Sequence, residues 1–174
     1  TQGGLVEADR KYFGSVLAKS FYGFSVGFNY KNFDFSVDSY GTMGAKVYNG
    51  KKAQRFSGEN IENSIASDFW TVNNTTASNP GAFNQVPVAS TYYLESGDFL
   101  RVNNITIGYK LPKIHESISF ARIYFNAINP FITKKFSGFS PELNGDGNPY
   151  GSQGVELDAY PTLKSFVLGI NLKF

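Results

Sequence analysis

Residues 166–174 read Phe-Val-Leu-Gly-Ile-Asn-Leu-Lys-Phe, and apolar residues occupy every second position of this stretch. A β-strand directs successive side chains to opposite faces. One face would therefore carry Phe166, Leu168, Ile170, Leu172 and Phe174, while the other would carry only small, polar or short aliphatic side chains. Such a strand is typical of a membrane-embedded β-barrel, in which one face meets lipid and the other a wet interior.

The same two-residue period recurs along the chain. Strands are predicted at about 20–31, 32–43, 98–111 and 119–128, and the final strand at about 163–174. The first two are separated by only Lys31 and Asn32, which predicts a hairpin.

The connections alternate between short and long. The links near 31–32 and 112–118 are short, whereas those at about 44–97 and 129–162 are long. Outer-membrane barrels have short periplasmic turns and long extracellular loops. If Phe174 lies at the periplasmic side, every link agrees with that polarity. Loop 44–97 is too long to lack structure, and the spacing of Ile61, Ile65 and Phe69 predicts a short helix within 59–70.

The composition limits the other classes of protein. Charged residues are 17% of the chain, below the roughly 25% of an average globular domain. The net charge of +2 is too small to indicate a nucleic-acid partner, and the absence of cysteine excludes disulfides and cysteine-ligated metals. Because a closed barrel needs roughly eight strands, five strands would be either the C-terminal part of a larger barrel or one protomer of an assembly. The start at Thr1, without Met, favours the first.

Several passages, in this order, resemble one known family. They are Tyr22-Gly23-Phe24 with Tyr30-Lys31-Asn32-Phe33-Asp34-Phe35-Ser36; Asp68-Phe69-Trp70-Thr71 with Asn79-Pro80; Phe99-Leu100-Arg101-Val102-Asn103-Asn104-Ile105-Thr106-Ile107-Gly108-Tyr109; Asn126-Ala127-Ile128-Asn129-Pro130-Phe131; Ser137-Gly138-Phe139-Ser140-Pro141-Glu142; and Tyr160-Pro161. With them the chain resembles the C-terminal barrel segment of SusC/RagA-like TonB-dependent outer-membrane transporters of Bacteroidetes-type bacteria. It departs from the family at Ser140, where Asp is usual, and at Leu163-Lys164-Ser165, where Arg-Ser or Arg-Thr is usual.

The resemblance implies a roughly 22-stranded transmembrane antiparallel β-barrel, of which residues 1–174 form the C-terminal part. The plug domain and TonB box of the family are expected outside this chain. The implied function is TonB-energised uptake of a bulky oligosaccharide or peptide across the bacterial outer membrane. The implied partners are the rest of the barrel with its plug, a SusD-like surface lipoprotein that acts as a lid, TonB and the lipid bilayer. No enzymatic activity and no nucleic-acid partner are expected.

Two sets of residues are expected to serve this function. Lumen-facing polar side chains would be Asp34, Asp38, Arg122 and Asn126, because they occupy the polar face of predicted strands. Contacts to the lid or to substrate would come from loop aromatics, namely Phe69, Trp70, Phe83, Tyr92 and Tyr93. The alternative for the second set is a loop folded onto its own aromatic side chains. The resemblance further implies that Phe174 carries the barrel-insertion signal.

Other chemistry is weakly indicated. Asn144, Asp146 and Asn148 resemble a calcium loop, but no Glu stands at the twelfth position, so neither a metal nor any other cofactor is expected. His115 beside Glu116 would need an acid and a nucleophile brought to its turn to be catalytic. Asp34 and Asp38, four residues apart on one strand face, could form the acid/base pair of a glycosidase fragment, although lumen-facing charges are the expected role. A different class of function remains open at this point. A secreted carbohydrate-binding β-sandwich would bury the same apolar strand faces between two sheets.

Overall fold

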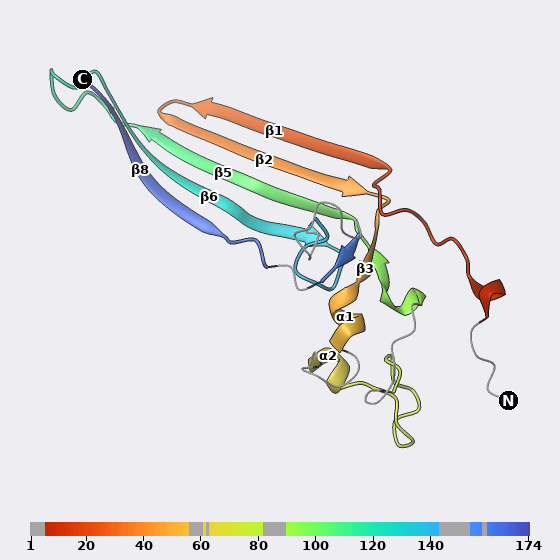
Figure 1. The fold of residues 1–174 in the computed structure, drawn as a ribbon. Coiled ribbons are helices and arrows are strands. Elements are labelled where there is room, and N and C mark those ends of the chain that lie inside the picture. The colour runs from red at the N-terminus through yellow and green to blue at the C-terminus, as the bar shows by residue number, and fades with distance from the viewer. Residues whose placement is uncertain (1–5, 56–60, 62, 82–89, 143–153, 158–159) are drawn as a thin grey trace.

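The computed structural model describes residues 6–55, 61, 63–81, 90–142, 154–157 and 160–174. Its main feature is one five-stranded antiparallel sheet (Figure 1). The strands are β1 (Ser20–Tyr30), β2 (Phe33–Met43), β5 (Phe99–Lys110), β6 (Phe120–Lys134) and β8 (Ser165–Lys173), in the order β1-β2-β5-β6-β8. The five segments expected from the two-residue period correspond to these strands in order, and β1 and β8 are the edges of the sheet.

The register aligns like with like across the sheet. In the β1–β2 hairpin Val26 pairs with Val37 and Phe28 with Phe35, while Ser25 pairs with Asp38 on the opposite face. The hairpin turns tightly at Lys31, whose φ of 53° lies in the left-handed region. We call the two surfaces of the sheet the apolar face and the polar face. The apolar face carries Phe24, Val26, Phe28, Phe35, Val37, Ile105, Ile107, Ile123, Phe125, Leu168 and Ile170.

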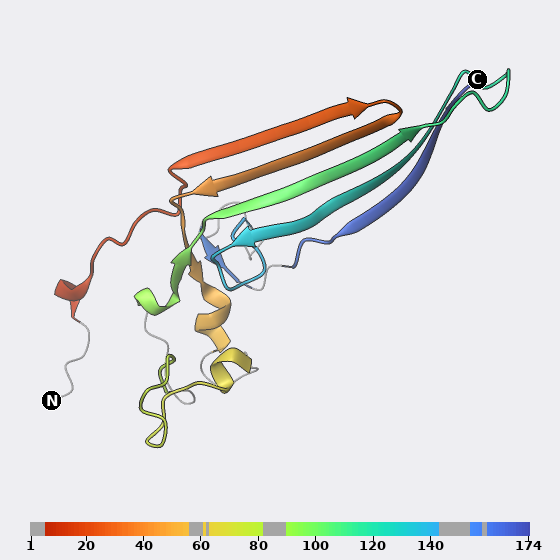
Figure 2. The same ribbon diagram turned by 180° about the vertical axis from the view of Figure 1, so that it is seen from behind.

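The long connections gather at one end of the sheet, which we call the loop end (Figures 1 and 2). A second small sheet there has the order β4-β3-β7, formed by β3 (Lys46–Asn49), β4 (Leu94–Ser96) and β7 (Val155–Glu156). The same end holds the helices α1 (Gly50–Arg55) and α2 (Asn63–Ala66) and the 3-10 turns η1 (Glu7–Asp9) and η2 (Thr91–Tyr93). The opposite end, the turn end, has the turns at 31–32 and 111–119 and Phe174.

Helix α2 lies inside the stretch 59–70 in which a short helix is expected, but α1 is an addition to the sequence prediction. Its first turn is capped by Asn49, whose Oδ1 accepts a hydrogen bond of 2.8 Å from the backbone N–H of Lys52. A side-chain oxygen at this position satisfies one of the free N–H groups that begin every helix.

Strand β6 runs to Lys134, six residues beyond the expected end at 128, so the expected outer loop 129–162 begins later than predicted. The reason is its neighbour, because β5 begins at Phe99 and pairs Phe99 with Lys134. An irregularity opposite Val102–Asn104, with Asn129 at φ 51°, accommodates Pro130. Since β8 pairs with β6 only as far as Ile128, the missing N–H of proline interrupts no ladder on that side.

The apolar face is exposed rather than packed. Phe28 is 57% and Leu168 is 76% exposed, and among the described residues no second sheet covers them. Buried apolar side chains instead gather mainly toward the loop end, at Val47, Ala53, Ile65, Tyr93, Phe99 and Phe136. The β-sandwich alternative requires two sheets packed face to face, so the structure contradicts it. A contiguous exposed apolar surface of this kind is typical of contact with a membrane or a partner.

None of the helices in the described ranges has both the length and the apolar character needed to cross a bilayer.

Candidate functional site

A row of hydrogen-bonded polar side chains crosses the polar face from β1 to β6. Asp38 accepts hydrogen bonds from Ser25 Oγ at 2.5 Å and from Asn104 Nδ2 at 3.3 Å. The amide of Asn104 also donates to Thr106 Oγ1, and the Thr106 hydroxyl donates to Asn126 Oδ1, each at 3.3 Å. Two of the expected lumen-facing residues, Asp38 and Asn126, therefore belong to one network on one face.

The other two expected residues form an ion pair nearer the turn end. Arg122 donates from Nε to Asp34 Oδ1 at 2.8 Å and from Nη2 to Asp34 Oδ2 at 2.5 Å. The guanidinium also lies 5.1 Å from the centre of the Tyr124 ring. Because bidentate pairing occupies both carboxylate oxygens of Asp34, Asp34 and Asp38 are held by separate partners and are not arranged as an acid/base pair.

This ion pair spans a strand. Asp34 is on β2 and Arg122 on β6, and Gly108 of β5 lies between them. A Cβ atom at Gly108 would overlap Arg122 Nε and lie 2.5 Å from Asp34 Oδ1. The contact therefore requires glycine at this position, because any side chain would separate the charges.

We expect Gly108→Ala to destabilise the barrel by roughly 0.5–1 kcal/mol, because the ends of the Arg122 and Asp34 side chains would move aside and their ion pair would be lost. Gly27→Ala is the matched control, because a Cβ there would meet Phe35 O at 3.4 Å and Ser36 Cβ at 3.7 Å, which are ordinary contacts. The measurement is urea unfolding of the full-length protein in detergent. Equal midpoints for the two variants would contradict the role assigned to Gly108.

A second polar cluster fastens the loop after β6 to the sheet. Arg101 of β5, only 4% exposed, donates from Nε to Glu142 Oε2 at 2.8 Å, and its Nη2 also pairs with that oxygen. Ser140 Oγ donates to Glu142 Oε2 at 2.7 Å, and Tyr40 donates its hydroxyl to Oε1 at 2.5 Å. The passages 99–109 and 137–142, separate in the sequence, thus meet here.

Sequence reasoning did not select Arg101 and Glu142 as site residues, although both lie in passages that carry the resemblance. Each is an ordinary charged residue until the fold brings the loop onto β5. Ser140, which stands where the family usually has Asp, is buried beside them and receives a 3.2 Å hydrogen bond from Arg101 Nη2. A neutral hydroxyl at this position leaves Glu142 as the acidic partner of Arg101 among the described residues of this cluster.

The cluster predicts a pH dependence. Burial raises the pKa of Glu142, but the hydrogen bonds from Arg101, Tyr40 and Ser140 outweigh burial and hold the pKa below its usual value of 4.5. A lowered folded-state pKa contributes stability above the ordinary pKa, and this contribution is lost as the pH falls through the folded-state pKa. We expect thermal stability of the full-length protein to fall below about pH 4.5, and this fall to be smaller in Glu142→Gln. Identical acid profiles for the two proteins would contradict this role.

The loop around Trp70 is held by hydrogen bonds within the loop and by one from Tyr92. Trp70 N–H donates to Asn79 O at 2.9 Å, and Asn79 Nδ2 donates to Asp68 O at 2.7 Å. The hydroxyl of Tyr92 donates to Asn79 Oδ1 at 2.5 Å and so joins η2 to this loop. Burial, with the nearby charges of Tyr93 and Glu95, raises the pKa of Tyr92 to about 12, which keeps the hydroxyl protonated as a donor. Trp70 itself is 47% exposed.

The expected aromatic contact residues differ in accessibility. Tyr93 is 4% exposed and packs against Tyr48 and Tyr92, with ring centres 5.8 Å and 5.0 Å away. For Tyr93 the structure matches the alternative in which the loop folds on its own aromatics. Phe69 and Tyr92 are half-buried, and Phe83 lies outside the described residues.

The last residues singled out in the sequence are Phe174, His115 and the three residues of the calcium-like loop. Phe174 is exposed at the turn end (Figure 1). His115 accepts a 3.2 Å hydrogen bond from the N–H of Ser117 within its own turn. Asn144, Asp146 and Asn148 lie outside the described residues, and in the described part of the chain no three His, Cys, Asp or Glu side chains gather as metal ligands would.

Comparison with known proteins supports the resemblance. No family model matches the chain. The chain is 26% identical over 179 residues to TonB-dependent receptor P3 of Formosa agariphila. The matched region covers 99% of this chain and 18% of that protein. It is 28% identical over 182 residues to TonB-dependent receptor SusC of Bacteroides thetaiotaomicron, covering 98% of this chain and 17% of SusC. The chain therefore spans less than a fifth of the length of these relatives.

Solved structures agree. The structure of the RagAB peptide transporter superposes with a TM-score of 0.79 at 27% identity, covering 98% of this chain and 19% of that one. The RagAB peptide importer in the closed-closed state gives a TM-score of 0.79 at 26% identity, covering 100% and 19%. The all-β fold, with its short turns and long loops, is thereby confirmed as that of a barrel wall. In both sequence and fold, the chain matches a barrel segment of SusC/RagA-like TonB-dependent outer-membrane transporters.

Proposed function

We propose that this chain forms part of the wall of an outer-membrane importer that takes up a bulky oligosaccharide or peptide. TonB would supply the energy through a plug that lies outside this chain. The observation that carries the proposal is the two-faced sheet, because its exposed apolar face suits lipid and its hydrogen-bonded polar face suits a wet lumen. The similarity to proteins named TonB-dependent receptors, and to solved RagAB peptide transporters, supports the same function.

The expected polar residues have a specific role in this proposal. Asp34 and Arg122 neutralise each other, whereas Asp38 is an anion held by neutral donors from Ser25 and Asn104. Such a wall would offer a passing polar solute neutral hydrogen-bonding groups beside the carboxylate of Asp38. In this proposal the polar side chains bind the solute and let it pass, and they take part in no covalent chemistry.

The test is uptake by cells. Two strains are compared, one in which the gene is inactivated and the same strain complemented with the intact gene. Both are given fluorescently labelled oligosaccharides and labelled peptides in parallel. We expect accumulation of one cargo class in the complemented strain only, and its loss on addition of a protonophore that dissipates the proton-motive force. Equal uptake in both strains, or uptake that survives the protonophore, would contradict energised import.

A SusD-like surface lipoprotein is the proposed partner at the loop end. The family resemblance supports such a lid. Trp70 supports it further, because an exposed Trp on a loop held by internal hydrogen bonds loses little freedom on binding.

We expect Trp70→Ala to weaken association with the lid protein by about 2 kcal/mol, the size of a typical aromatic hot spot. Val72→Ala, an exposed position in the same loop, is the control and should change association little. The measurement is recovery of the lid protein with the affinity-tagged full-length transporter at increasing detergent wash. Unchanged recovery with Trp70→Ala would remove Trp70 from the interface.

A further inference from the structure

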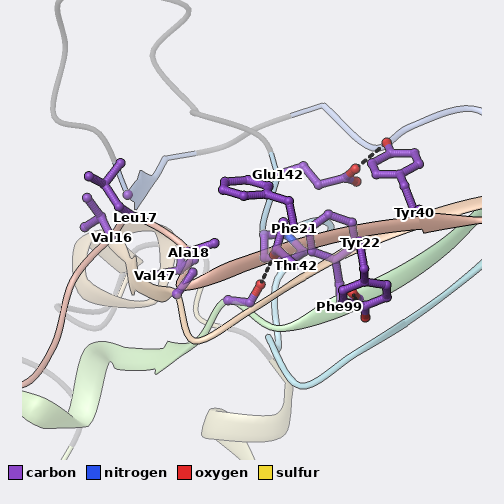
Figure 3. Close-up of a pocket in the computed structure, with 16 residues that line it drawn as sticks. Val16, Leu17, Ala18, Phe21, Tyr22, Tyr40, Thr42, Val47, Phe99 and Glu142 are labelled. Atoms are coloured by element: carbon purple, nitrogen blue, oxygen red, sulfur yellow. Dashed lines mark hydrogen bonds between the residues drawn. The ribbon is translucent and has the colours of Figure 1, made fainter.

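A cavity of about 590 Å³ lies at the loop end of the β1–β2 hairpin (Figure 3). Its walls come from the segment before β1, from the ends of β1, β2 and β5, and from the loop that carries Glu142. The register places Phe21 and Tyr40 on the polar face, since Phe21 pairs with Thr42 and Tyr40 with Gly23. Figure 3 shows Phe21, Tyr40 and Glu142 on the same side of the hairpin, so the cavity borders the polar face.

The walls of this cavity are mainly apolar. The large aromatic side chains on the polar face of the hairpin are Phe21 and Tyr40, both at the cavity, and the other residues on that face are Gly, Ser, Asn, Asp and Thr. Phe21 is 77% exposed on that face, beside the exposed Leu17 and Val16. Large apolar side chains grouped around a hollow on a wet surface indicate a site for an apolar ligand group.

The hydroxyl groups in the lining already donate their protons to other groups of the protein. Tyr22 donates its hydroxyl to Phe99 O at 2.8 Å, Tyr40 donates to Glu142 Oε1 at 2.5 Å, and Thr42 donates to Gly97 O at 3.3 Å. The Glu142 carboxylate is neutralised by Arg101. A sugar brings several hydroxyls that each need a partner, and burying them without one is costly. The lining therefore suits an apolar group better than a sugar ring.

We propose that this cavity is a subsite for apolar side chains of peptide cargo. The inference rests on the proposed import function and selects peptide over oligosaccharide as the ligand class at this site. The volume lies within the range of about 300–1,000 Å³ that is usual for ligand pockets. Phe21 forms the exposed apolar wall, and the Tyr40–Glu142 hydrogen bond holds the rim.

The test is binding to the purified full-length transporter in detergent. The probes are two synthetic peptides of equal length and charge, one with leucines and one with serines at the same positions, and maltohexaose as the sugar. We expect the leucine peptide to bind at least about tenfold more tightly than the serine peptide, a difference of about 1.4 kcal/mol. Phe21→Ser should abolish this preference. Phe21→Leu should keep it, and Asn29→Ser, at the other end of the polar face of β1, should leave it unchanged.

The outcomes separate this inference from the import function. The proposed peptide subsite is contradicted if Phe21→Ser binds the leucine peptide as tightly as the parent protein does. It is also contradicted if Phe21→Ser loses binding of maltohexaose instead. If labelled oligosaccharide enters by protonophore-sensitive uptake while neither peptide binds, import stands and the subsite falls. If no cargo of either class enters in an energy-dependent manner, the import function itself fails, whatever the peptides do.

Discussion

Leu168→Arg should remove the assembled barrel from the outer membrane, whereas Val167→Arg should leave it in place. Leu168 is on the apolar face of β8, opposite Phe125, and Val167 is its neighbour on the polar face, opposite Asn126. An arginine directed into lipid near the middle of a membrane strand costs about 2–4 kcal/mol, because the guanidinium loses its hydration. The same arginine on the polar face stays in water. One strand therefore supplies both the variant and its control, one residue apart.

The measurement is the amount of heat-modifiable, folded protein in outer-membrane fractions, followed by urea unfolding of whatever assembles. The expected order of stability is parent, then Val167→Arg close to it, then Leu168→Arg well below. Leu168→Arg would also destabilise a soluble protein in which the apolar face is buried. The fraction of protein recovered without detergent is therefore recorded as well. Tolerance of arginine at Leu168 together with loss at Val167 would reverse the assignment of the two faces.

Arg101→Leu should be the most destabilising change at the loop end, by about 3 kcal/mol, because it leaves the carboxylate of Glu142 partly buried without its cation. The hydrogen bonds from Ser140 and Tyr40 remain, but neither carries charge. The loop that carries Glu142 should then detach from β5 and become accessible to proteases.

The double variant Arg101→Leu/Glu142→Leu is the matched control. Removing both charges avoids an unpaired carboxylate, and replacing a buried ion pair by apolar side chains is often nearly neutral. We therefore expect the double variant to recover most of the stability lost by Arg101→Leu. The measurements are the urea midpoint of the full-length protein in detergent and the rate of cleavage in the loop after β6. Additive losses in the double variant would show that the two side chains do not act as a pair.

The strand pattern was predictable from the sequence because it is local. The two-residue period of segments such as 20–31 and 163–174 follows from the geometry of each strand alone, and the difference between short turns and long loops is visible in spacing. These two signals were enough for the faces of the sheet, for the end at which the long loops gather and for the placement of Asp34, Asp38, Arg122 and Asn126 on one surface. Both signals are local, so they do not depend on the sequence of the rest of the barrel.

Which side chains meet depends on the tertiary structure and could not be predicted from the local pattern. Asp34 and Arg122 are 88 positions apart and touch across Gly108, and Arg101 and Glu142 are 41 apart. Strand β6 passes residue 128 because β5 offers it a partner there, and Tyr93 is buried because the loop end folds around it. Hydrogen bonds and packing between distant residues depend on register and loop path. A periodic pattern within one strand contains no information about either.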